Sequence, residues 1–251
     1  MSGMDLAAAA RLPEALNQSC FCFNLDRAAL ARELEAKLGS PALAQMVAQR
    51  CPFVFAAQPV FVVSAQAHQM AQVVRSVESV VALAAYRRRV LAAAPDIARI
   101  GVAGQRGVFF GYDFHLTAGR LGLIEINTNA GGAMLNAVLA RAQLGCCPAM
   151  EHLLPCAAGA DHFERQIVDM FRQEWRLAGR VRPLRSIAIV DDAPEQQSLY
   201  PEFLLFQQLF ARHELHALIA RAAFHLPAVV PPARTRAHSA GARRTGLRAA
   251  S

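Results

Sequence analysis

Three oxygen-bearing side chains fall within the stretch GVFFGYDFHLTAGRLGLIEINTNAGGAMLN, which runs from residue 107 to residue 136. They are Asp113, Glu125 and Asn127. Two carboxylates and an amide are hard oxygen ligands, the kind that Mg²⁺ or Mn²⁺ takes while it keeps other positions for water and phosphate oxygens. These residue types indicate a divalent-metal site, provided that the chain brings the three side chains together.

The pattern around these residues predicts a β-hairpin. Apolar and aromatic residues flank a short polar turn, which gives strand, turn and strand over residues 108–116, 117–120 and 121–127. With the loop centred on Gly119, Asp113 falls directly opposite Glu125, about 5 Å away at Cβ. Asn127 lies two residues further along the strand and therefore on the same face. Facing like charges are destabilising, so this arrangement needs a cation or a raised carboxyl pKa.

The segment after the second strand predicts a turn that binds an anion. Asn129, Gly131 and Gly132 lead into a helix expected to end at Leu144. Glycine lets the backbone approach a ligand closely, and the first turn of a helix offers free N–H groups to an anion. A phosphate group would fit beside the predicted metal site.

The spacing of these residues resembles the magnesium-binding core of the ATP-grasp ligases. The resemblance consists of an aspartate, eleven intervening residues, a glutamate, one further residue and an asparagine. More narrowly, GYDFHL followed by LIEINTNAGGA is similar to the circularly permuted ATP-grasp proteins and to the synthetase domain of glutathionylspermidine synthetase. The resemblance covers roughly residues 50–220 and is sharp in the hairpin.

This resemblance implies an activity and a set of site residues. Asp113, Glu125 and Asn127 would hold the Mg²⁺ that bridges the phosphates of ATP, and Asn129 with the Gly131–Gly132 backbone would support the phosphate or acyl group. The implied reaction joins a small carboxylate to an amine or thiol through an acyl phosphate, and no catalytic side chain is identified. The synthetases carry an arginine where this chain has Gly111, so the substrate stays open.

Two other readings stay open. His115 lies two residues after Asp113, so Asp113, His115 and Glu125 could form a zinc or iron site of a hydrolase or oxygenase. Alternatively, the chain could be an inactive relative or an interaction module whose acidic hairpin binds nothing.

Composition and charge narrow the range of partners. The net charge is +7, and most of it comes from six arginines between residues 221 and 251, where no acidic residue occurs. We find no basic stripe elsewhere, so we expect no nucleic-acid partner. No run of about eighteen uncharged apolar residues and no secretory signal are present, so we expect a cytoplasmic protein without a membrane segment. The six cysteines lack paired C-x-x-C spacing and are expected to be reduced core thiols.

The chain as a whole predicts a mixed α/β (α+β) fold. It divides into a helical lead-in, an ATP-grasp-like metal- and ATP-binding portion, a partial parallel β-α-β domain and a basic low-complexity tail, at residues 1–50, 51–180, 181–221 and 222–251. In the lead-in, Asn24 or Asp26 caps a helix that Gly39 ends, and Ser40-Pro41 starts a second helix to Arg50.

Further elements follow from local patterns. Residues 51–63 predict a strand, and Ser64 caps a long helix over 65–94. Asp161 caps a helix to about residue 178, whose apolar stripe, expected in the core, is Phe163, Ile167, Met170, Phe171 and Trp175. A strand at 186–190, buried on both faces, a helix at 201–211 and a strand at 215–220 form the β-α-β unit. Asp191 and Asp192 then either meet a polar substrate group or cap the following helix.

The last thirty residues differ in character from the rest. Residues 222–251 show no sustained period and are rich in Ala, Arg, Pro, Gly and Ser, as in a low-complexity tail or a shifted reading frame. The only lysine of the chain is Lys37, whereas intact ATP-grasp enzymes use lysines to contact phosphates and adenine. We therefore expect an incomplete enzyme that retains the metal half of the site.

Overall fold

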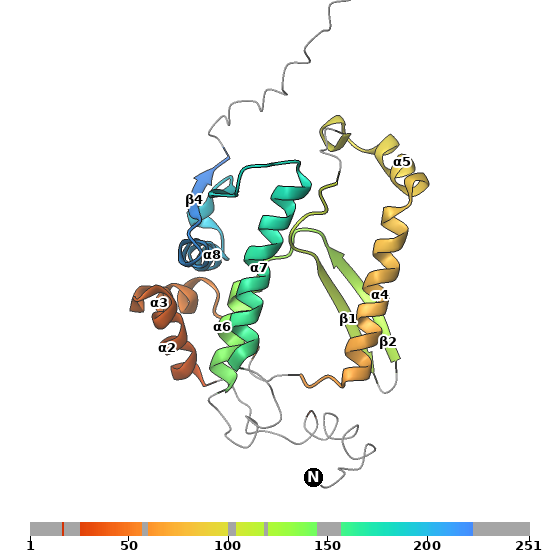
Figure 1. Ribbon diagram of the computed structural model, residues 1–251. Coiled ribbons are helices and arrows are strands. Elements are labelled where there is room, and N and C mark those ends of the chain that lie inside the picture. Colours follow the sequence, from red (N-terminus) through yellow and green to blue (C-terminus); the bar gives the residue numbers. More distant parts are fainter. Residues whose placement is uncertain are drawn as a thin grey trace, which may run out of the picture.

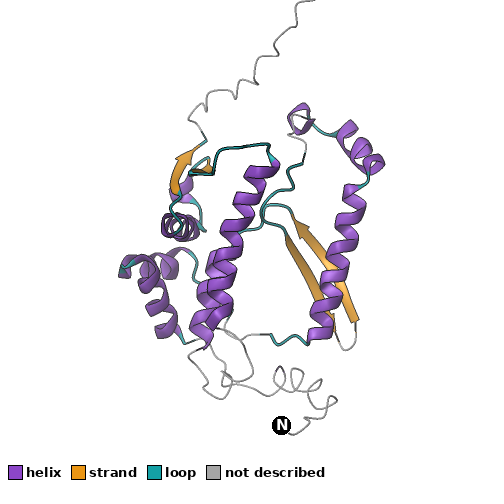
Figure 2. Cartoon of the chain, in the orientation of Figure 1, coloured by secondary structure: helices purple, strands orange, loops and turns teal. Residues whose placement is uncertain are grey.

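The computed structural model describes residues 17, 26–56, 60–99, 104–117, 120–144 and 157–222. In these residues the chain forms helices and two small two-stranded sheets, which confirms the mixed α/β class (Figures 1 and 2). The helices are α2 (Arg27–Leu38), α3 (Pro41–Arg50), α4 (Ser64–Ala82), α5 (Ala84–Ala93), α6 (Ala133–Leu144), α7 (Ala157–Leu177) and α8 (Tyr200–Arg212), with short 3-10 turns η1 (Asp96–Arg99) and η3 (Pro194–Gln196). The strands are β1 (Gly111–Thr117), β2 (Arg120–Asn127), β3 (Ser186–Asp191) and β4 (His216–Arg221).

Helices α6 and α7 form the centre of the molecule. In Figure 1 α2, α3, α8 and β4 lie on one side of them, and the β1-β2 hairpin with α4 and α5 lies on the other. One hydrophobic cluster draws buried side chains from α2, α3, α6, α7, α8 and β4. Its most deeply buried members include Leu34, Leu43, Met134, Val168 and Phe210. The core thus lies on one side of the molecule, and the hairpin is attached to its edge.

The first two helices begin and end where the sequence predicts. Asp26 Oδ1 accepts hydrogen bonds from the backbone N–H groups of the first turn of α2, and Gly39 ends that helix with a φ of 64°. Ser40 Oγ accepts from the first turn of α3, which starts at Pro41. These caps satisfy backbone groups that a helix terminus otherwise leaves unpaired.

The predicted strand at 51–63 and the single helix at 65–94 are both wrong. In the described parts of the first segment, residues 52–55 form a turn and a bend, residues 60–63 have no regular structure, and Phe53 is 93% exposed. Proline at position 52 removes a ladder donor, and β-rich composition without a partner strand does not make a sheet. The helix begins at Ser64 itself and breaks at Leu83, whose ψ of 126° is extended.

The base of the hairpin is fixed to α7 and α8 by two kinds of contact. Glu174 of α7 accepts hydrogen bonds from the backbone N–H groups of Arg106 and Gly107, at 3.0 and 3.2 Å. Just before β1, Phe109 packs against Phe171 and Phe206, with ring centroids 6.0 and 5.5 Å apart. The strands therefore extend from a region that the core holds in place.

The β3-α8-β4 unit has the predicted parallel order, with Ser186 opposite His216 at its start. The expectation that β3 is buried on both faces is wrong, because its residues alternate between exposed and half-buried and Val190 is 45% exposed. A two-stranded sheet has too few neighbours to cover both faces. Ahead of it, α7 begins at Ala157 and not at an Asp161 cap.

The buried face of α7 differs from the predicted stripe. Ile167 and Phe171 pack in or against the core, as predicted, but Phe163 is 37% exposed. Val168 and Glu164 are buried in its place. The helical period is as predicted, but the buried face of α7 is rotated by about one residue from the predicted stripe.

Several sequence predictions lie partly or wholly outside the described residues. Cys51 is a buried free thiol, which confirms the prediction for that residue, and the other five cysteines lie outside. Residues 223–251 of the basic tail also lie outside. None of the helices described is both long and apolar enough to cross a membrane.

Candidate metal centre

The hairpin pairs Asp113 directly with Glu125, which confirms the pairing predicted from the sequence, although the register closer to the loop differs by one residue from the predicted one. β1 and β2 are antiparallel, and at their open end Gly111 pairs with Asn127. Directly opposed residues share a face of the sheet, as do residues two apart along one strand. Asp113, Glu125 and Asn127 therefore lie on one face.

A β-bulge at Ile124 puts Glu125 on this face. Residues 114–117 pair with residues 120–123 in a register that, if continued, would set Asp113 opposite Ile124. The register shifts at this point, so that Ile124 has no partner and Glu125 lies opposite Asp113. Because side chains alternate between faces, a shift of one residue decides which face each later residue of β2 occupies.

The turn after β2 packs closely against the start of β1. Asn127 Oδ1 accepts a hydrogen bond from the backbone N–H of Asn129 at 3.2 Å, which bends the chain as the strand ends. A Cβ added at Gly111 would lie 3.1 Å from the Cβ of Ala130. A side chain at position 111 would press on the turn that carries Asn127 and Asn129, which is a packing reason for glycine at this position.

Both carboxylates of the pair are exposed. Within the described residues neither the Asp113 carboxylate nor the Glu125 carboxylate has a hydrogen-bond or ion-pair partner. Their mutual repulsion is therefore not offset by any described cationic side chain. Asn127 contributes a neutral oxygen beside them, so the face presents donor atoms that suit a hard divalent cation.

His115 lies on the same face of β1, two residues after Asp113, and is exposed. In the part of the chain that the structure describes, no three His, Cys, Asp or Glu side chains are close enough to hold a metal ion. Asp113, His115 and Glu125 are thus not gathered as one ligand group. The alternative site made of Asp113, Glu125 and Asn127 does not require His115 to lie close to the two carboxylates.

Glu202 of α8 caps the N-terminus of α6, which the sequence analysis missed. The N–H of Gly132 donates to Glu202 Oε2 at 2.6 Å, and that of Met134 donates to Oε1 at 2.9 Å. Glu202 is 3% exposed, and burial raises the pKa of its carboxyl group despite these hydrogen bonds. A Cβ on Gly131 would lie 2.8 Å from Leu199 Cδ1, so glycine at this position leaves room for Leu199, the residue before α8. The predicted anion position therefore holds the protein's own carboxylate.

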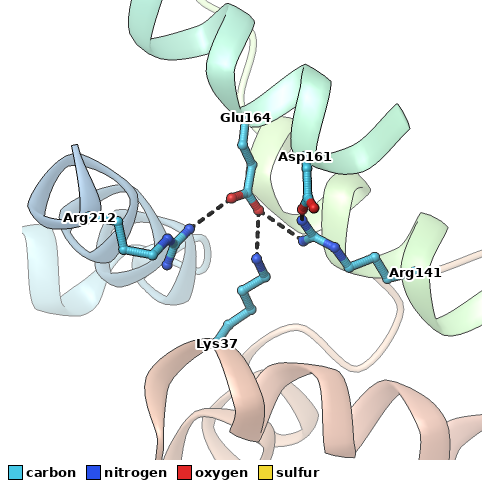
Figure 3. A network of polar contacts seen from close by, with 5 residues as sticks. All are labelled: Lys37, Arg141, Asp161, Glu164 and Arg212. Carbon is cyan, nitrogen blue, oxygen red and sulfur yellow. Dashed lines mark hydrogen bonds and ion pairs between the residues drawn. The ribbon is translucent and has the colours of Figure 1, made fainter. Parts of the chain in front are cut away.

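A second buried carboxylate, Glu164 of α7, is bound by three cations (Figure 3). Lys37 Nζ and Arg141 Nη1 contact its Oε1 at 2.9 and 2.8 Å, and Arg212 Nη2 contacts Oε2 at 2.8 Å. Arg141 also pairs with Asp161 at 2.5 Å. Burial alone would raise the pKa of Glu164, but hydrogen bonds and charge from Lys37 and Arg141 lower it to about 2. This network joins α2, α6, α7 and α8, and the sequence analysis identified none of it.

The two aspartates at the end of β3 have different environments. Asp191 Oδ1 accepts hydrogen bonds from the N–H of Ala193 at 3.1 Å and from Gln197 Nε2 at 2.8 Å. Asp191 thus shapes the turn after β3, but no side chain caps η3 or α8, so the prediction that Asp191 caps the following helix is wrong. Asp192 is exposed, and it has no partner among the described residues.

Comparisons with known proteins add no family to this geometry. No protein-family model matches the chain, and no curated protein or solved structure matches it either. The description of the site therefore rests on the residues themselves: an exposed acidic face of a bulged hairpin, next to a helix N-terminus that a buried glutamate caps.

Proposed function

We propose that the exposed face of the hairpin binds Mg²⁺ or Mn²⁺ together with the phosphates of ATP, as part of an incomplete ATP-grasp-like ligase. The observation that carries the proposal is the direct pairing of Asp113 with Glu125, with Asn127 on the same face. Like charges placed opposite each other cost stability in the absence of a ligand. A divalent cation removes this repulsion and uses the same oxygens as ligands.

The proposed reaction joins a small carboxylate to an amine or thiol. A bound metal would supply charge neutralisation for transfer of the γ-phosphoryl group to the substrate carboxylate. Asp113, Glu125 and Asn127 hold and orient that metal, and Asn129 lies in the adjoining turn. The amine or thiol then attacks the acyl carbon, and inorganic phosphate leaves. This chemistry depends on positioning and charge stabilisation and needs no protein nucleophile.

Two contacts support the proposal that the nucleotide site of this chain is incomplete. The single lysine of the chain, Lys37, lies in α2 and pairs with Glu164. In Figure 1, α2 lies on the other side of α6 and α7 from the hairpin. The N–H of Gly132, which the resemblance assigns to phosphate binding, is occupied by Glu202. The hairpin would thus supply the metal ligands, whereas a phosphate at α6 would have to displace Glu202.

Titration with Mn²⁺, a paramagnetic substitute for Mg²⁺, tests this proposal by electron paramagnetic resonance. The signal of the free ion should fall as protein is added, and ATP should increase the fraction bound. Asp113→Asn and Glu125→Gln should each weaken binding by about tenfold or more, because each removes a charged ligand. Asp96→Asn, at a 95% exposed carboxylate paired with Arg99, is the matched control.

The same titration separates the proposal from the hydrolase or oxygenase alternative. His115→Ala should leave Mn²⁺ binding within about twofold. A loss as large as that of Asp113→Asn would instead favour the site made of Asp113, His115 and Glu125. Absence of Mn²⁺ binding by the folded wild-type protein, with or without ATP, would contradict the proposal and leave an inactive relative or interaction module.

A further inference from the structure

An arginine-lined cavity of about 790 Å³ lies where α7 ends and β3 and β4 begin. Its walls come from the last turns of α7, the connection to β3 and the segment before β4. The hairpin contributes no residue to them. Five arginines line it: Arg172, Arg176, Arg180, Arg182 and Arg185. A search of the sequence for a basic stripe does not find this cluster, because the arginines meet only in the fold.

Little negative charge offsets these arginines. Arg172 pairs with Asp169 at 3.4 Å, and Arg176 donates to the neutral amide of Gln173 at 2.6 and 3.1 Å. Within the described residues the guanidinium groups of Arg182 and Arg185 have no partner. The one carboxylate that lines the cavity is Glu214. Clustered guanidinium groups repel each other, and an anion between them removes that repulsion.

Trp175 holds one wall of the cavity in place. Its indole Nε1–H donates to the backbone carbonyl of Arg182 at 2.6 Å, and the guanidinium of Arg180 lies over its ring at 5.6 Å. Gly179, with a φ of 72°, ends the helix between these contacts. The backbone that carries Arg180 and Arg182 is thereby fixed against α7, so binding of a ligand does not have to order this segment.

We propose that this cavity binds a compact small molecule that carries several phosphate groups. Guanidinium groups offer planar forks of N–H donors that match phosphate oxygens two at a time. The volume of about 790 Å³ is that of a small-molecule site, and the lining is concave, not an extended stripe. Several arginines with one carboxylate suit a ligand with several negative charges. The site is separate from the metal face and does not depend on the proposed ligase reaction.

Calorimetric titration with inorganic tripolyphosphate in the presence of EDTA tests this site without the metal face. The wild-type protein should bind, and the double variant Arg182→Gln/Arg185→Gln should bind at least about tenfold more weakly. The matched control is Arg87→Gln/Arg88→Gln, which removes the same charge from exposed positions on α5. It should bind within about twofold of the wild type. Circular dichroism checks that each variant is folded.

Three results would overturn the assignment. No binding by the wild type would remove the site. An equal loss in the α5 control would show that net charge, and not the cavity, attracts the probe. The third test is a titration with citrate, a compact tricarboxylate. If citrate bound as tightly as tripolyphosphate, the cavity would recognise carboxylates equally well, and the assignment to a phosphate ligand would be wrong. Asp113→Asn should leave tripolyphosphate binding in EDTA unchanged, so this site and the metal site are tested separately.

Discussion

Asp113 and Glu125 face each other without a described partner, so their repulsion should be measurable in the metal-free protein. Asp113→Asn should raise the free energy of unfolding in EDTA by about 0.5 kcal/mol, because it removes one of two facing like charges. With Mg²⁺ and ATP the order should reverse, since ligand binding then stabilises the wild type more than the variant. Urea unfolding in the two buffers measures both. A variant less stable than wild type in EDTA would contradict the repulsion.

Glu202 is a second residue whose role can be measured directly. Glu202→Ala should lower the free energy of unfolding by about 2–4 kcal/mol, because two N–H groups at the start of α6 lose their acceptors. Glu202→Gln keeps one acceptor and the side-chain volume without a buried charge, so it should cost less. Urea unfolding of both variants is the measurement. An equal cost for Gln and Ala would show that the negative charge itself is required.

At the scale of the element, the bulge in β2 determines which side chains share a face. Deletion of Ile124 should give a regular ladder that still pairs Asp113 with Glu125, so Mn²⁺ affinity should stay within about threefold. Deletion of Ile126 leaves that pair but turns Asn127 to the opposite face, so affinity should fall by about tenfold. Each deletion removes one isoleucine from the same strand, so they are matched. Equal affinity for the two deletion variants would show that Asn127 is not a ligand.

Local signals in the sequence were enough for some elements and not for others. The caps at Asp26 and Gly39 act within a few residues, and they predicted α2 correctly. The sequence analysis reached the Asp113–Glu125 pair with a loop centred on Gly119 and a regular ladder. The structure reaches the same pair with a bulge at Ile124, because the register close to the loop is different. No local sequence pattern distinguishes the regular ladder from the bulged one.

Other features depended on residues distant in sequence. Glu202 caps α6 from 70 positions away, and a glutamate in the first turn of a helix ordinarily indicates only a favourable dipole contact.

The burial of Glu164, in contrast, can be predicted from the sequence, because Glu164 lies three and four residues before Ile167 and Val168 and thus on the buried face of α7. A charged residue on an apolar face indicates a buried partner, and Lys37 provides one.

At the scale of the whole molecule, the Glu164 network should make stability depend on acid. The pKa of Glu164 is about 2 in the folded protein, below its ordinary value of 4.5. Its ionisation therefore stabilises the fold fully above about pH 4.5, and this contribution is lost as the pH falls through about 2. The difference corresponds to about 3 kcal/mol at neutral pH. Acid unfolding followed by circular dichroism should show this loss.

Glu164→Gln tests whether that loss comes from the network. The variant should be less stable by about 3–5 kcal/mol near pH 7, because Lys37, Arg141 and Arg212 would cluster around a neutral amide. The gap between the variant and the wild type should narrow as the pH falls from about 4.5 to about 2. A gap that stays constant across this range would show that another group causes the acid dependence.

Calorimetric titration of the full chain with Mg²⁺ and ATP together tests the central claim most directly. The account predicts joint binding by the wild type, weakened by about tenfold or more in both Asp113→Asn and Glu125→Gln and unchanged in Asp96→Asn. Joint binding that persists in both hairpin variants would place the nucleotide elsewhere. No binding by the folded wild-type protein would contradict the claim that this hairpin is a metal–nucleotide site.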